Sequence, residues 1–230
     1  AHQQFKLGDI DKGFSEADFV LEREYRTKTV HQGYIEPQNG TAWWTSDGQL
    51  TIWCSSQGHF GIRDNTATVL GHDVSKIKVV PMEIGGGFGG KLPIYLEPLA
   101  SILSKKSGRP VKMTMSRAEV LEATGPTSGS LVKIKMGVTS QGRITAVKAY
   151  LAFEAGAYPG SPVAGAAVCM LGPFDVNNLL IDGYDVVTNK PKTSAYRAPG
   201  APMGAFAVEA LVDEICESLD MDPLEFRRLN

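Results

Sequence analysis

Cysteine is scarce in this chain, and its three copies are far apart. The 230-residue sequence contains Cys54, Cys169 and Cys216, and none of them belongs to a CxxC pair. Such spacing gives no disulfide framework and disfavours zinc or iron–sulfur ligation by this chain alone. We therefore expect three buried cysteines that behave as small apolar side chains, in a reducing compartment, and we predict a cytoplasmic protein.

A surplus of positive charge and long apolar runs are also lacking. The 23 Lys and Arg residues against 25 Asp and Glu give a net charge of −2, so we expect no nucleic-acid partner. No apolar run approaches the ~20 residues of a membrane helix, so we expect no membrane span. The N-terminus has neither a start methionine nor a signal-peptide pattern. The last residues, DPLEFRRLN, are typical of a helix that is cut off, and we expect the chain to be a piece of a longer protein.

Apolar residues are abundant enough, at 43%, for a real core. Alternating patterns and turn signals predict strand material at 18–30, 41–55, 75–84, 109–116, 130–156 and 178–189. Helical spacing and capping residues predict helices at 57–71, 93–106, 116–124, 161–171, 202–219 and from 222 onward. Hairpins are expected at 41–55 and 130–156. This mixture predicts an α+β fold with mixed sheets, hairpins and packed helices.

The stretch EIGGGFGGKLP, residues 83–93, has five glycines in six positions, with Phe88 among them. A backbone without Cβ atoms can come within hydrogen-bonding distance of a ligand. Successive N–H groups of such a backbone bind anionic or electron-rich groups. Phe88 would close one side of the site and exclude water. The stretch therefore predicts a loop that binds a large polar cofactor.

Two nucleotide-binding patterns also match in part. Gly85, Gly87 and Gly90 satisfy G-x-G-x-x-G between a predicted strand and a predicted helix, so an NADP-binding domain with Arg117 on the 2′-phosphate stays open. A P-loop would need Ser or Thr after Lys91 to hold Mg²⁺, and Leu92 stands there instead. A non-catalytic assembly module is a third hypothesis.

The segment GGGFGGK (85–91) resembles the cofactor-binding loop of the molybdenum hydroxylases, the xanthine dehydrogenase and aldehyde oxidase family. Residues 25–44 and 50–80 are similar to earlier segments of the family's large subunit. Residues 188–230 look like its second signature, an arginine-bearing loop before a long helix and a terminal DPLEFR. The resemblance implies that residues 1–230 are the first molybdopterin-binding domain of a large subunit. A division of this domain into two sub-lobes is left open.

The resemblance also implies an oxidoreductase and its cofactors. The family hydroxylates small organic substrates with water as the oxygen source, and we expect an aldehyde, an N-heterocycle or an acyl-CoA-like compound. The expected cofactor is molybdenum–molybdopterin, with 2Fe-2S clusters and FAD on other domains or subunits. The remaining half of the large subunit is an expected partner. The family's catalytic glutamate follows a GxGE-like motif that is absent here, so we expect no catalytic residue and no metal ligand in this chain, which would be inactive by itself.

The resemblance assigns cofactor-binding roles to six residues. Gln57 matches a glutamine that hydrogen-bonds an oxygen ligand of molybdenum, and Arg197 matches an arginine whose backbone approaches the cofactor. The loop beside the cofactor is matched by Gly86, Gly87, Phe88 and Gly89.

The chain departs from the purine-oxidising members of the family at several positions, and no arginine stands in residues 124–130, where those members have one. Leu92 replaces a glutamate that orients the purine, and Pro199 replaces an aromatic residue. A proline stacks against a purine far more weakly than an aromatic ring does. We therefore expect that xanthine is not the substrate.

Overall fold

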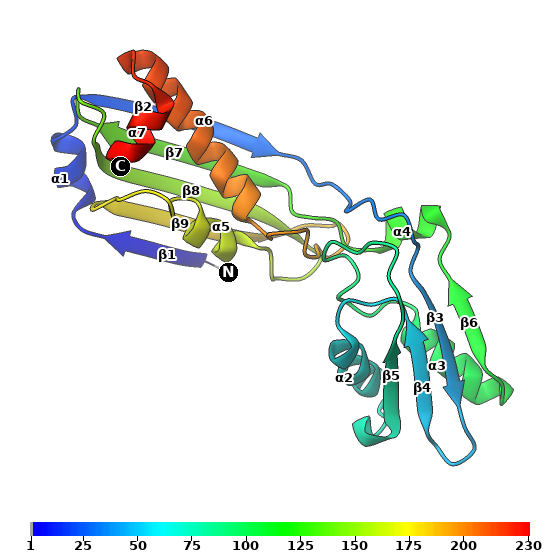
Figure 1. Cartoon of the computed structure of the whole chain (residues 1–230). Coiled ribbons are helices and arrows are strands. Elements are labelled where there is room, and N and C mark those ends of the chain that lie inside the picture. Colours follow the sequence, from blue (N-terminus) through cyan, green and yellow to red (C-terminus); the bar gives the residue numbers. More distant parts are fainter. Residues whose placement is uncertain (1) are drawn as a thin grey trace. The chain divides into compact units, whose positions relative to one another are not determined.

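The chain folds into two compact units, each with its own sheet (Figure 1). The computed structural model describes residues 2–230. Unit 1 contains the chain up to Val30, then Ser128–Thr193 and Ala198–Asn230. Unit 2 contains His31–Thr127 and Ser194–Arg197. Two mixed sheets with helices packed on them confirm the predicted α+β class.

Unit 1 is built on a five-stranded sheet. Its strands, in their order across the sheet, are β1 (His2–Leu7), β9 (Leu179–Val187), β8 (Ile144–Gly156), β7 (Ser130–Val138) and β2 (Phe19–Thr27). The hairpin predicted at 130–156 is confirmed as β7 and β8, and only the β8–β9 pair is parallel. β1 has no counterpart in the prediction, because its mostly polar residues become a strand by pairing with β9.

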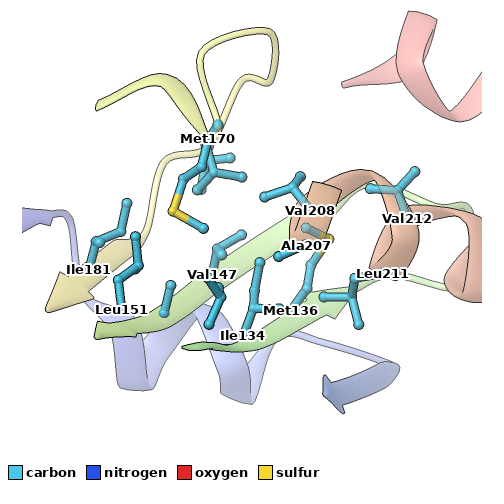
Figure 2. Packing of buried hydrophobic residues seen from close by; sticks show 14 of the residues in the cluster. Ile134, Met136, Val147, Leu151, Met170, Ile181, Ala207, Val208, Leu211 and Val212 are labelled. Carbon is cyan, nitrogen blue, oxygen red and sulfur yellow. The ribbon is translucent and has the colours of Figure 1, made fainter. Parts of the chain in front are cut away.

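Helix α6 (Ala201–Leu219) buries its predicted apolar face in the core of unit 1. Figure 2 shows Ala207, Val208 and Leu211 of α6 beside Met136 of β7. Leu219, which follows the same helical spacing as Val208, Leu211, Val212 and Ile215, is only partly buried at the end of the helix. The other helices of this unit are α1 (Ile10–Ser15), α5 (Val163–Cys169) and α7 (Pro223–Leu229).

Unit 2 has a four-stranded mixed sheet. Its strands, in order, are β5 (Ile77–Pro81), β4 (Leu50–Cys54), β3 (Asn39–Trp44) and β6 (Val111–Thr114). The parallel pair β4–β5 is connected through α2 (His59–Leu70) and the 3₁₀ turn η1 (Val74–Lys76). The remaining helices are α3 (Glu97–Ser107) and α4 (Arg117–Ala123), and Ser116 and Glu119 form the predicted capping box of α4.

The NADP-binding interpretation is wrong for this fold. The strands before and after the glycine stretch, β5 and β6, lie at opposite edges of the sheet rather than side by side. Helix α3 begins at Glu97 and not at residue 93, so the glycines do not open a helix that could hold a pyrophosphate. The guanidinium of Arg117, proposed to bind the 2′-phosphate, instead donates to the carbonyl oxygen of Ile35.

The cysteine prediction holds for two of three residues. Cys54 and Cys216 are buried, but Cys169 is exposed, because it lies on the outer side of the short helix α5. All three thiols are unpaired. Among residues 2–230, no helix is both long and apolar enough to span a membrane.

Candidate functional site

The glycine loop, residues 85–90, is a tight turn in unit 2. The N–H of Gly90 donates to the carbonyl oxygen of Gly87 at 2.8 Å, and the two central residues have φ of 50° (Phe88) and 99° (Gly89). Positive φ at both central positions is the pattern of type I′ turns. A non-glycine residue in the left-handed region of φ and ψ destabilises the backbone by about 1–2 kcal/mol. The turn therefore depends on further contacts that hold Phe88 in place.

The glycines of the loop also permit close packing. A Cβ on Gly87 would lie 2.6 Å from Oε1 of Gln57, and a Cβ on Gly90 would lie 2.7 Å from Cε1 of Tyr34. Real Cβ atoms essentially never show such contacts. Side chains at these positions would therefore displace the residues that support the loop.

Three successive backbone N–H groups in the loop are unpaired. The N–H groups of Gly86, Gly87 and Phe88 have no hydrogen-bond acceptor within residues 2–230, whereas those of Gly85 and Gly89 are bonded to side chains. The ring of Phe88 is 45% exposed beside them. Consecutive free amides suit an anionic or electron-rich group. The loop can therefore hold the polar edge of a cofactor.

Gln57 precedes α2 and supports the loop from the inside. Its Oε1 accepts hydrogen bonds from the N–H groups of Gly89 (2.8 Å) and Lys91 (3.2 Å). Its own backbone N–H donates to the carbonyl oxygen of Lys91 at 3.0 Å. Because the oxygen is committed to the loop, the Nε2 donors are available, and no described residue accepts from them.

The segment 194–197 lies against the other side of the loop. The N–H of Arg197 donates to the carbonyl oxygen of Phe88 at 2.9 Å, and Ser194 Oγ donates to that of Gly89 at 3.3 Å. Gln32 Nε2 holds the segment through the carbonyl oxygen of Ala195. The guanidinium of Arg197 is exposed and forms no ion pair with any residue in the described range. Arg197 therefore reaches the loop through its backbone.

Glu36 and Lys91 form an ion pair beneath the loop that the sequence did not reveal. Lys91 is 1% exposed, and its Nζ lies 2.6 Å from Oε2 of Glu36. The same oxygen accepts the N–H of Gly85 at 2.8 Å. Burial by itself would raise the pKa of Glu36, but hydrogen bonds from Lys91, Gly85 and Asn39 outweigh it and lower this pKa to about 2. Lys91 is thus used inside the protein and is not free to bind a phosphate.

The lowered pKa of Glu36 predicts how stability depends on pH. A depressed carboxylate pKa stabilises the folded state above its ordinary value of 4.5, and this contribution is lost as the pH falls toward 2. We expect the difference in the free energy of unfolding between the native protein and Glu36→Gln to be constant from pH 7 to about 5 and to shrink at lower pH. Urea unfolding at a series of pH values measures this difference. A difference that stays constant down to about pH 3 would contradict it.

A hollow of about 530 Å³ adjoins Gln57 between α2 and β5. Its lining includes the aromatic ring of Phe60 and the cationic side chains of Arg63 and Lys78.

Among residues 2–230, no group of three or more His, Cys, Asp or Glu side chains is arranged to hold a metal ion.

The model of the molybdopterin cofactor-binding domain family matches residues 1–230. The chain belongs to this family. The domain is 31% identical over 231 residues to the nicotinate dehydrogenase large molybdopterin subunit of Eubacterium barkeri, covering 99% of this chain and 54% of that subunit. It is 32% identical over 229 residues to indole-3-acetaldehyde oxidase of Zea mays, covering 97% of this chain and 17% of that protein.

Solved structures show the same fold as this molybdopterin cofactor-binding domain. The aldehyde oxidoreductase from Desulfovibrio desulfuricans ATCC 27774 has a TM-score of 0.90 at 27% identity, covering all of this chain and 26% of that one. Quinoline 2-oxidoreductase from Pseudomonas putida 86 has a TM-score of 0.93 at 24% identity, covering all of this chain and 30% of that one. The domain spans 17% to 54% of the length of the curated relatives it matches.

Proposed function

We propose that this domain binds the molybdenum–molybdopterin cofactor of an oxidoreductase that hydroxylates a small organic substrate with water as the oxygen source. The observation that carries the proposal is the row of unpaired N–H groups at Gly86, Gly87 and Phe88, beside the free Nε2 of Gln57. Membership of the cofactor-binding family supports it. Residues 1–230, with both units, are proposed as one functional domain.

Each site residue has a separate role in this proposal. The bound cofactor supplies the redox chemistry, and the protein supplies position and electrostatics. The amides of residues 86–88 hold the polar edge of the cofactor, and Nε2 of Gln57 donates to an oxygen atom of it. Phe88 excludes water from one side. Gly89 and the N–H of Arg197 keep Phe88 in its turn.

The catalytic base and the path for electrons lie outside this domain. We propose that the remaining half of the large subunit supplies the base, and that 2Fe-2S and FAD domains or subunits accept the electrons. The three unpaired thiols suit a reducing compartment, and we place the enzyme in the cytoplasm.

The substrate is proposed to be an aldehyde, an N-heterocycle or an acyl-CoA-like compound, and not xanthine. Leu92 follows the loop with a side chain that is 44% exposed, and it can neither accept nor donate a hydrogen bond. A site that hydrogen-bonds its substrate can discriminate by about 10⁴–10⁵-fold against an analogue that lacks the bonding group, and a leucine at this position cannot make such a bond.

We expect xanthine to be oxidised at least about tenfold less efficiently than the best aldehyde or N-heterocycle, as measured by kcat/KM. Comparable values would contradict this assignment.

The deciding experiment is elemental and pterin analysis of the full-length protein that carries this domain, purified with its partners. About one molybdenum and one pterin per chain, with activity on a member of the three substrate classes, are expected. A full-length protein that contains neither would instead be a non-catalytic assembly module.

A further inference from the structure

Lys91 ends the glycine-rich stretch, yet its side chain is almost completely buried. A lysine is almost never fully buried unless its charge is paired. Its ammonium group lies 2.6 Å from Glu36 Oε2, 3.4 Å from Ser55 Oγ and 5.1 Å from the centre of the Tyr34 ring. Among the described residues, Glu36 is the only charged group in contact with it.

The pair connects the two ends of the glycine loop. One oxygen of Glu36 binds both the N–H of Gly85, where the chain enters the loop, and the Nζ of Lys91, where the chain leaves it. The backbone of Glu36 also donates to the carbonyl oxygen of Gly85 at 3.0 Å. At the exit, the carbonyl oxygen of Lys91 accepts from Ser56 Oγ at 3.1 Å and from the N–H of Gln57. The three unpaired amides lie between these two anchored ends.

We propose that Glu36 and Lys91 are a positioning pair, which fixes the backbone of the glycine loop so that its free amides are already in place for a ligand. A loop with five glycines has a large conformational freedom to lose on binding, and restraint of both ends removes most of it beforehand. Neither residue touches the ligand. The identity of that ligand rests on the proposed function, but the restraint of the loop does not.

The experiment measures hydrogen exchange of the peptide covering residues 83–93 in the full-length protein, with its cofactor and after the cofactor is removed. The variants are Lys91→Met, Glu36→Gln and the double variant. Glu36→Gln leaves the buried ammonium group of Lys91 without a partner, and Lys91→Met leaves the partly buried carboxylate of Glu36 without one. The hydrogen-bonded amides of the loop, such as those of Gly89 and Gly90, should therefore exchange at least about tenfold faster. The double variant leaves no such charge, and the glutamine amide still accepts from Gly85, so exchange should return to within about threefold of the native rate.

Glu97→Gln is the matched control. Glu97 is a buried glutamate of unit 2, and it accepts a hydrogen bond from the N–H of Tyr95 and not from the loop. Its replacement should change thermal stability without changing exchange in residues 83–93.

The outcomes separate the inference from the proposed function. Native exchange rates in both single variants, or the same acceleration in Glu97→Gln, would overturn the positioning role. Faster exchange with an unchanged molybdenum content would support the restraint of the loop but place the cofactor elsewhere. If a single variant does not fold, the double variant decides: recovery of a folded protein with a protected loop supports the pair, and failure to recover overturns it.

Discussion

Replacement of Gly87 by valine is expected to abolish cofactor retention in the complete protein while the fold stays largely intact. The first added atom would lie 2.6 Å from Oε1 and 2.8 Å from Cδ of Gln57. The end of a glutamine side chain can move away, but it then gives up its bonds to the N–H groups of Gly89 and Lys91. Such hydrogen bonds contribute about 0.5–1.5 kcal/mol each, so a loss of about tenfold or more in affinity for the cofactor is expected.

Molybdenum and pterin content per folded chain measures this effect, with thermal unfolding as the check on the fold. Gly61→Val is the matched control, because a Cβ at Gly61 in α2 meets no atom within 4 Å. The control should retain its cofactor. A normal molybdenum content in Gly87→Val would show that the loop does not hold the cofactor.

Replacement of Leu211 by alanine is expected to cause a large loss of stability. Leu211 lies on α6, is 0% exposed, and packs among the sheet residues of unit 1 (Figure 2). Removal of a buried leucine side chain leaves a cavity and typically costs about 2–5 kcal/mol of the free energy of unfolding. Urea unfolding followed by circular dichroism measures the loss.

Leu224→Ala is the control variant, a leucine-to-alanine change at an exposed helical position. Leu224 lies on α7 with 64% of its side chain exposed, so its replacement should change the free energy of unfolding by less than about 0.5 kcal/mol. Equal losses in the two variants would mean that α6 does not cover the core of unit 1.

Regular patterns predicted the larger elements of the fold. Helix α6 and the β7–β8 hairpin were predictable because their side chains repeat at 3.6 and 2 residues. β1 was not, since an edge strand with polar side chains is defined by its partner β9. The start of α3 was placed too early, because residues 93–96 form an irregular connection before Glu97.

The candidate site was predictable in its residues but not in its contacts. The glycine count and the resemblance point to Phe88, Gln57 and Arg197. They do not indicate that the amide oxygen of Gln57 faces the loop or that Arg197 reaches it through its backbone. The Glu36–Lys91 pair escaped prediction because two charged residues far apart in sequence are paired only by the tertiary fold.

Unit 2 is an insertion between two neighbouring strands of unit 1, and this has a consequence for folding order. The last pair of the β2–β7 ladder, Thr27 with Ser130, flanks nearly the whole of unit 2. Before unit 2 folds, β2 and β7 can meet only by closing a long flexible chain, whose entropy cost grows with its length. Once unit 2 is folded, only short flexible segments remain between β2 and β7. We therefore expect unit 2 to form first and the β2–β7 ladder to follow. The bond from Arg197 to Phe88 completes the turn only after the chain has returned from unit 1 for the last time.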